Sequence, residues 1–210
     1  MTESAQKPKR FSMLREFRLA DLFTLSNAAF GTVSLFMCLA FLESHNSRFI
    51  WIAIACLPLS FIADGLDGWV ARKRQAWSRI GADLDSLADV ISFGVAPAVL
   101  AFTLGMRGGW DIVVLVYFVL CGISRLARYN VTADELSGED GKVKYFEGTP
   151  IPSSLILVVI LAIAVWQGSF GVELWFGEVA FLGPKFHPLV LMFAVSGSAM
   201  VSSSLRIPKP

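Results

Sequence analysis

Two short stretches decide the fold, DGLDGWVAR at residues 64–72 and GADLDSLAD at residues 81–89. Both lie in apolar surroundings, and four of their aspartates recur at helical spacing. These are Asp64, Asp67, Asp85 and Asp89. A carboxylate next to a hydrocarbon phase is energetically costly unless a cation or a proton compensates its charge. Four carboxylates that converge on one place therefore predict bound divalent metal, and with it an enzyme working at a membrane surface.

Composition places the chain among integral membrane proteins. It has 210 residues, of which 55% are hydrophobic and only 17% are charged. Soluble domains carry about a quarter charged residues. About 20 apolar residues are needed for one helix to cross a bilayer, and the apolar blocks are of that length. We therefore expect an all-α polytopic protein with a single domain over 22–210 and six spans. The expected spans are 22–43, 49–69, 83–105, 110–130, 151–170 and 186–205.

The basic residues are distributed very unequally between the two sides that six spans define. One side carries both termini and the loops near 70–82 and 131–150, and it holds 15 of the 18 basic residues. The opposite side holds only Arg48, Arg107 and Lys185. Cytoplasmic loops are enriched in lysine and arginine, so this partition predicts that the termini and the aspartates face the cytoplasm. The expected location is therefore the cell membrane.

Residues 1–21 form a separate N-terminal segment. Residues 1–10 are polar, and residues 11–21 mix apolar and charged side chains at helical spacing. This pattern predicts a cytoplasmic tail followed by a short amphipathic helix lying on the membrane surface. The alternative is a simple basic flank to the first span.

The aspartates are spaced so that they share helix faces. Asp64 and Asp67 point the same way as Gly68 and Ala71 on one helix. On the next helix a second face repeats every four residues, and Asp83 falls roughly opposite to it. The members of that second face are Gly81, Asp85 and Asp89. Small residues beside two rows of carboxylates leave a hollow between antiparallel helices.

A hollow lined by carboxylates suits Mg²⁺ or Mn²⁺, which prefer oxygen ligands. Four carboxylates make two cations plausible, and a pair about 4 Å apart is a known clamp for phosphoryl displacement. Arg72 lies next to the hollow and can pair with a phosphate. Acidic residues of this kind also line cation or proton pathways in transporters, so a non-catalytic ion-binding protein is the alternative.

The first span adds two polar residues at the depth of the aspartates. Thr24 and Asn27 are three residues apart, so they lie on one helix face. Such residues either bond a neighbouring helix or contact a ligand, which here would be the nucleotide. The two interpretations are equally supported by the sequence.

The complete spacing resembles the signature of the CDP-alcohol phosphotransferase family, D-x-x-D-G-x-x-A-R, eight residues, then G-x-x-x-D-x-x-x-D. Every fixed position of that signature is filled. The resemblance implies a six-helix membrane enzyme in which a CDP-linked lipid passes its phosphatidyl group to an alcohol and CMP leaves. It implies metal ligation by Asp64, Asp67, Asp85 and Asp89. It also makes Asp89 the base that takes the proton of the alcohol.

The same resemblance assigns a role to the small residues and the arginine of the signature. They match family positions that shape the cytidine and diphosphate site. These residues are Gly68, Ala71, Arg72 and Gly81. The resemblance also implies a homodimer, and nucleic acid is not an expected partner.

Three further stretches resemble the serine-using branch of the family: DSLADVISFG at 85–94, RLARYN at 125–130 and YFEGTPIP at 145–152. They imply CDP-diacylglycerol and L-serine as substrates and phosphatidylserine as product. Arg125 and Arg128 share a helix face and can bind the carboxylate of an amino acid, although such arginines also snorkel to lipid headgroups. Ser92, one turn beyond Asp89, either helps to hold serine or packs between helices, and the sequence supports both equally. Another acceptor, glycerol phosphate or inositol phosphate, is the alternative within the family.

Overall fold

The structure is a computed structural model that describes residues 19–74, 79–136, 145–180, 183–202 and 206–208. It is mainly helical and has two small two-stranded sheets. This confirms the predicted all-α class. The long helices are α2 (Leu19–Ser44), α3 (Ser47–Arg74), α4 (Arg79–Asp89), α5 (Ala96–Thr103), α6 (Gly109–Leu136), α7 (Leu155–Trp166) and α8 (Leu191–Val201).

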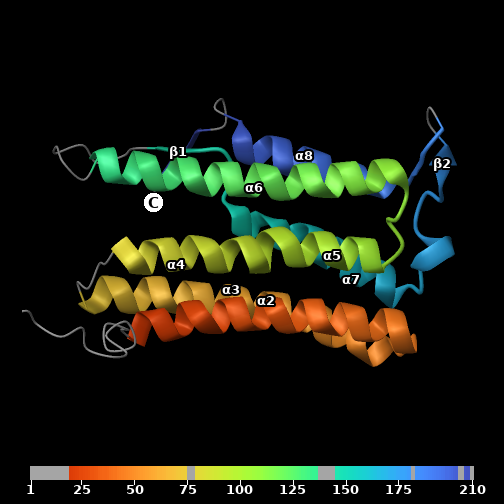
Figure 1. The fold of residues 1–210 in the computed structure, drawn as a ribbon, viewed down its shortest axis with the longest axis horizontal. Helices are drawn as coiled ribbons and strands as arrows, with labels where there is room; N and C mark the ends of the chain where they lie inside the picture. The colour runs from red at the N-terminus through yellow and green to blue at the C-terminus, as the bar shows by residue number, and fades with distance from the viewer. Residues whose placement is uncertain (1–18, 75–78, 137–144, 181–182, 203–205, 209–210) are drawn as a thin grey trace, which may run out of the picture.

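The helices run along one common direction in three layers (Figure 1). α2 and α3 pack along each other in the first layer, and α6 packs against α8 in the last. The middle layer holds α4, α5 and α7. The end of α3 and the start of α4 lie at one end of the bundle, whereas β2 (Val179–Ala180) lies at the other.

Four of the helical segments are long and apolar enough to cross a membrane. They are Asp21–Ser44, Ser47–Val70, Ile80–Thr103 and Gly109–Val131. Each matches one of the first four predicted spans, with shifted ends. Together with the composition they identify an integral membrane protein. The third segment begins before the predicted residue 83, because the helix already starts at Arg79.

The last two predicted spans are shorter than expected. The apolar helices there run over Ile151–Trp166 and Pro188–Val201, not over 151–170 and 186–205. The first of them ends where Gly168 adopts a left-handed backbone conformation with φ of 74°. The second begins with proline at its first turn, which suits a helix start.

The predicted surface helix over 11–21 falls mostly outside the described part of the chain. Residues 11–18 are not described, and the remaining three residues belong to the first turns of α2.

A π-helix, η1 (Val90–Val95), interrupts the third span directly after Asp89. Its widened turn is seen where the Ala96 amide donates to the carbonyl oxygen of Ile91, five residues earlier. Pro97 explains it, because proline has no amide hydrogen and its ring clashes with the carbonyl group four residues before it. π-turns of this kind occur often at functional sites. Here the turn begins at the residue after the last aspartate.

The chain between α6 and α7 is tied to the C-terminal segment by backbone pairing. β1 (Tyr145–Glu147) pairs antiparallel with β4 (Arg206–Pro208). Gly148 follows with φ of 75°, and a Cβ atom there would collide with the carbonyl oxygen of Met200. The Thr149 amide donates to the Ala199 carbonyl oxygen at 3.1 Å. This tight approach fixes the start of α7 against the end of α8.

We expect Gly148→Ala to lower the melting temperature of the purified protein more than Gly168→Ala does. Both glycines have φ near 75°, so both substitutions carry the same backbone strain, on the order of 1 kcal/mol. Only at Gly148 does the added methyl group meet another backbone, whereas nothing lies within 4 Å of it at Gly168. Thermal unfolding in detergent measures the difference, and equal losses in the two variants would contradict this packing.

Candidate active site

Three of the four predicted aspartates meet at one place. Ligand oxygens of Asp64, Asp67 and Asp85 all lie within 4.8 Å of one another. The first two project from α3 and the third from α4, and Asp67 is buried. Asp89 lies outside this trio but is also buried, and it interacts electrostatically with all three. Two neighbouring helices thus bring together Asp64, Asp67 and Asp85, whereas Asp89 is not part of this close group.

Helix α2 is the element that holds the two acidic rows in place. It packs against α3, α4 and η1, and it contributes a hydrogen bond to each row. The Thr24 hydroxyl donates to Asp67 Oδ2 at 2.7 Å. The Asn27 amide nitrogen donates to Asp89 Oδ1 at 3.1 Å. Thr24 and Asn27 thus both contact carboxylates of neighbouring helices. Of the two roles that the sequence left open, the helix contact is the one seen here.

The acidic trio fits a divalent cation. Its ligands are all carboxylate oxygens, which is the donor type that Mg²⁺ and Mn²⁺ prefer. Asp85 Oδ1 is buried and has no hydrogen-bond partner among the described residues. A buried, unpaired carboxylate oxygen between two other carboxylates is unfavourable without a cation. The residues present are therefore able to hold the metal that the sequence predicts.

The predicted nucleotide residues lie beside this trio in the chain. Gly68 follows Asp67 in α3 and is half-buried, and Gly81 is a half-buried residue near the start of α4. Ala71 and Arg72 belong to the last turns of α3, and their side chains lie outside the described part of the chain. Asp83, expected to face away, is exposed.

The predicted serine residues differ in their surroundings. The Ser92 hydroxyl is buried and donates to the main-chain oxygen of Asn27 at 2.9 Å, so it joins η1 to α2. Arg125 is half-buried on α6, and its Nε has no hydrogen-bond partner among the described residues. Its guanidinium group lies 6.0 Å from the Tyr129 ring centroid and interacts electrostatically with Asp89. Arg128 is exposed.

Two contacts at the site were missed by the sequence analysis. Ser86, between two predicted ligands, exchanges hydrogen bonds with Asn130 at 3.0 and 3.3 Å, which fastens α4 to α6. Asp21 is buried at the start of α2 and interacts electrostatically with Asp67. Both Ser86 and Asn130 stand inside the motif stretches, so their position was a usable signal. Asp21 looked like an ordinary acidic residue at a helix start.

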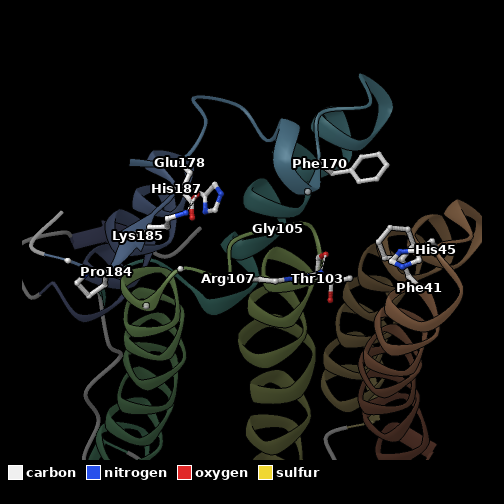
Figure 2. Close-up of a pocket in the computed structure, with 14 residues that line it drawn as sticks. Phe41, His45, Thr103, Gly105, Arg107, Phe170, Glu178, Pro184, Lys185 and His187 are labelled. Atoms are coloured by element: carbon white, nitrogen blue, oxygen red, sulfur yellow. Dashed lines mark hydrogen bonds and ion pairs between the residues drawn. The ribbon is translucent and has the colours of Figure 1, made fainter. Parts of the chain in front are cut away.

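A pocket of about 820 Å³ lies at the end of the bundle opposite to the aspartates (Figure 2). His45 and Phe41 stand on one side of it, Lys185 and His187 on the other. The neighbouring Asp111 is fully buried and accepts hydrogen bonds from the main-chain amides of Gly108 and His187. Both histidines thus lie away from the acidic trio. Among the described residues that line this pocket, Glu178 alone is acidic. The pocket therefore does not duplicate the cluster of aspartates.

The fold and the site together define a class of protein: an integral membrane protein with clustered aspartates at one end of a helical bundle. A family model described as CDP-alcohol phosphatidyltransferase matches residues 17–195. The chain belongs to this family, as the resemblance of its signature implied.

Curated relatives extend the comparison over most of the chain. The CDP-diacylglycerol–serine O-phosphatidyltransferase of Saccharomyces cerevisiae is 43% identical over 205 residues, which cover 95% of this chain and 74% of that protein. The Helicobacter pylori protein of the same name is 35% identical, covering 90% of this chain and 70% of its own length. An archaetidylserine synthase of Methanothermobacter thermautotrophicus is 39% identical, covering 67% and 55%. The chain thus spans little more than half of the length of some relatives.

We expect Mn²⁺ to raise the melting temperature of the protein, and Asp85→Asn to abolish most of that rise. A ligand that binds only the folded state stabilises it in proportion to the logarithm of its concentration over Kd. Removing one carboxylate also relieves repulsion, so the variant is expected to be at least as stable as the wild type in a chelator.

Asp83→Asn is the matched control, because Asp83 is an exposed aspartate two residues away on α4. It should keep the full response to Mn²⁺. An equal response in Asp85→Asn and Asp83→Asn would show that the cation binds elsewhere.

Proposed function

We propose that the chain transfers the phosphatidyl group of CDP-diacylglycerol to the hydroxyl group of L-serine, giving phosphatidylserine and CMP. The observation that carries the proposal is the convergence of Asp64, Asp67 and Asp85, with Asp89 beside them, in a member of this family. The names of the yeast and Helicobacter relatives support serine as the acceptor. So do the three stretches over 85–94, 125–130 and 145–152.

The cofactors we propose are two divalent cations, Mg²⁺ or Mn²⁺, held by the four aspartates. When bound, they neutralise the diphosphate and stabilise the charge that develops on the departing CMP. Gly68, Ala71, Arg72 and Gly81 are proposed to shape the site for cytidine and diphosphate. Thr24 donates to Oδ2 of Asp67 and thereby orients this carboxylate for ligation.

The reaction itself needs one proton transfer and one displacement at phosphorus. The serine oxygen forms a bond to the phosphorus that carries the diacylglycerol, and the bond from that phosphorus to the bridging oxygen of CMP breaks. The hydroxyl proton passes to Asp89. Asn27 orients this carboxylate by donating to its Oδ1, so that Oδ2 is the oxygen left for the hydroxyl group.

Serine recognition is proposed to rest on the arginines of α6. A carboxylate needs a cation or hydrogen-bond donors, and Arg125 presents a buried Nε without a partner among the described residues. Arg128 shares its helix face one turn later. Ser92 is proposed to contribute from η1, since its hydroxyl oxygen keeps capacity to accept a hydrogen bond.

The membrane arrangement we propose has six spans, with α7 and α8 as the fifth and sixth. The apolar helices Ile151–Trp166 and Pro188–Val201 are about 24 and 21 Å long at 1.5 Å per residue. They are shorter than the hydrocarbon core of about 30 Å, so the bilayer would be thinned beside them. Family resemblance further supports a homodimer. The acidic site and both termini are proposed to face the cytoplasm.

Membranes that contain the protein should incorporate labelled serine into lipid when CDP-diacylglycerol and Mn²⁺ are supplied. Asp89→Asn should lower the rate by about 10²- to 10⁴-fold, since it removes the proton acceptor. Asp83→Asn serves as control and should stay near wild type. Incorporation of glycerol phosphate or inositol phosphate without serine would reassign the acceptor. No release of CMP with any alcohol would favour the non-catalytic ion-binding alternative.

The proposed orientation is tested with two introduced cysteines, Ser47→Cys and Ala82→Cys. Both positions are exposed, one at the start of α3 and one in the first turn of α4. A membrane-impermeant maleimide applied to intact bacterial cells should label the first variant, and label the second only after permeabilisation. The wild type gives the background, because Cys38, Cys56 and Cys121 are buried. The opposite labelling pattern would invert the topology.

A further inference from the structure

Asn27 contacts the acidic site in a way that determines how its amide is oriented. The residue is 0% exposed, and its Nδ2 lies 3.1 Å from Asp89 Oδ1. In the proposed reaction Asp89 acts as an ionised base, and an ionised carboxylate only accepts hydrogen bonds, so the NH₂ group of the amide then faces Asp89. The amide oxygen, Oδ1, then points to another side of the same residue. This orientation follows from the chemistry of the pair and not from a choice between nearly identical atoms.

The amide oxygen of Asn27 is a buried acceptor that has no hydrogen-bond partner among the described residues. The Ser92 hydroxyl contacts Asn27, but it donates to the main-chain oxygen of that residue and not to its side chain. Buried polar atoms are rarely left unpaired in folded proteins, and the exceptions call for a ligand or an ordered water. Asn27 Oδ1 is therefore a buried hydrogen-bond acceptor that can receive a donor from a ligand, and it belongs to a residue that contacts the proposed base.

Among the described residues, Arg125 has an unsatisfied hydrogen-bond donor and interacts with Asp89. Its Nε is a buried donor with no partner among the described residues, and its charge interacts with that of Asp89. Asn27 is held to Asp89 by a direct hydrogen bond. One unpaired acceptor from α2 and one unpaired donor from α6 are thus both associated with the same carboxylate.

A free amino acid with a hydroxyl side chain matches this arrangement. It carries a donor group, the ammonium, and an acceptor group, the carboxylate, and in serine the ammonium and the hydroxyl sit on adjacent carbon atoms. With the hydroxyl directed at Asp89, the ammonium would lie within reach of a group hydrogen-bonded to that same carboxylate. A phosphorylated alcohol has no ammonium to pair with Asn27.

We propose that Asn27 is a specificity-determining residue for the acceptor: its Oδ1 accepts a hydrogen bond from the ammonium group of serine while its Nδ2 holds Asp89. This inference rests on the proposed function, because it assumes that serine is the acceptor. It moves Asn27 from the nucleotide to the acceptor. It also makes one side chain responsible both for orienting the base and for recognising the amino acid.

The test compares two acceptors, L-serine and 3-hydroxypropanoate, which is serine without its amino group. The measured quantity is the ratio of their kcat/KM values in the wild type and in two variants of Asn27. A hydrogen bond to a charged group discriminates by about ten- to a hundredfold, so the wild type should prefer serine by that factor beyond any other contact.

The two variants move this ratio in different directions. Asn27→Leu removes the acceptor and the donor while keeping the shape, so the preference for serine should fall by about ten- to a hundredfold. Asn27→Asp keeps an acceptor and gives it a negative charge, so the preference should be retained or increased. The absolute rate should drop in both, because Asp89 loses its donor. Should Asn27→Leu fail to fold, the ratio in Asn27→Asp still decides, since a loss of preference there contradicts the proposal.

Thr24→Val is the matched control, because it removes the other hydrogen bond from α2 to the acidic rows. It should slow both acceptors equally and leave the ratio unchanged. A ratio that stays the same in all Asn27 variants would assign Asn27 a purely structural role and overturn this inference alone. Wild-type membranes that use no serine at all would instead overturn the proposed function, and the inference with it.

Discussion

Repulsion among clustered carboxylates is the constraint on which the rest of the structure depends. Asp64, Asp67 and Asp85 bring their oxygens within 4.8 Å of one another at the end of an apolar bundle, with Asp89 close enough to interact. Such a cluster is unfavourable unless a cation or a proton compensates its charge, and among the side chains that the structure describes no basic residue forms an ion pair with it. A divalent cation would resolve the conflict, and it is also the group that the diphosphate of the proposed substrate would require. The stability of the fold and the proposed reaction would therefore both be served by a cation at this site.

Helix α2 provides the scaffold for that cluster. It packs against α3 along the first layer and also against α4 and η1, so it reaches both acidic rows (Figure 1). Thr24 and Asn27 each fix one carboxylate, and Ser92 returns a hydrogen bond to the backbone of α2. On the other side, the pair formed by Ser86 and Asn130 fastens α4 to α6. Asp67 and Asp89 are thus positioned by hydrogen bonds from α2, a helix that carries none of the four aspartates.

Much of this site could be predicted because the relevant patterns are local. The spacing of the aspartates places them on two helix faces, and hydropathy alone locates the first four spans. The short last helices and the π-turn at η1 could not be predicted in the same way. The π-turn depends on how Pro97 is accommodated in a packed helix. The β1–β4 pairing joins segments far apart in the chain, and three-residue strands carry no periodicity to detect.

The most direct test of the account is to locate Mn²⁺ in crystals of the protein by anomalous scattering. The account predicts two manganese peaks bounded by the carboxylates of Asp64, Asp67, Asp85 and Asp89. The peaks should vanish in Asp85→Asn crystals grown under the same conditions. Manganese bound only elsewhere, for example in the pocket at the opposite end of the bundle, would contradict the central claim. So would the absence of any peak between α3 and α4 at saturating Mn²⁺.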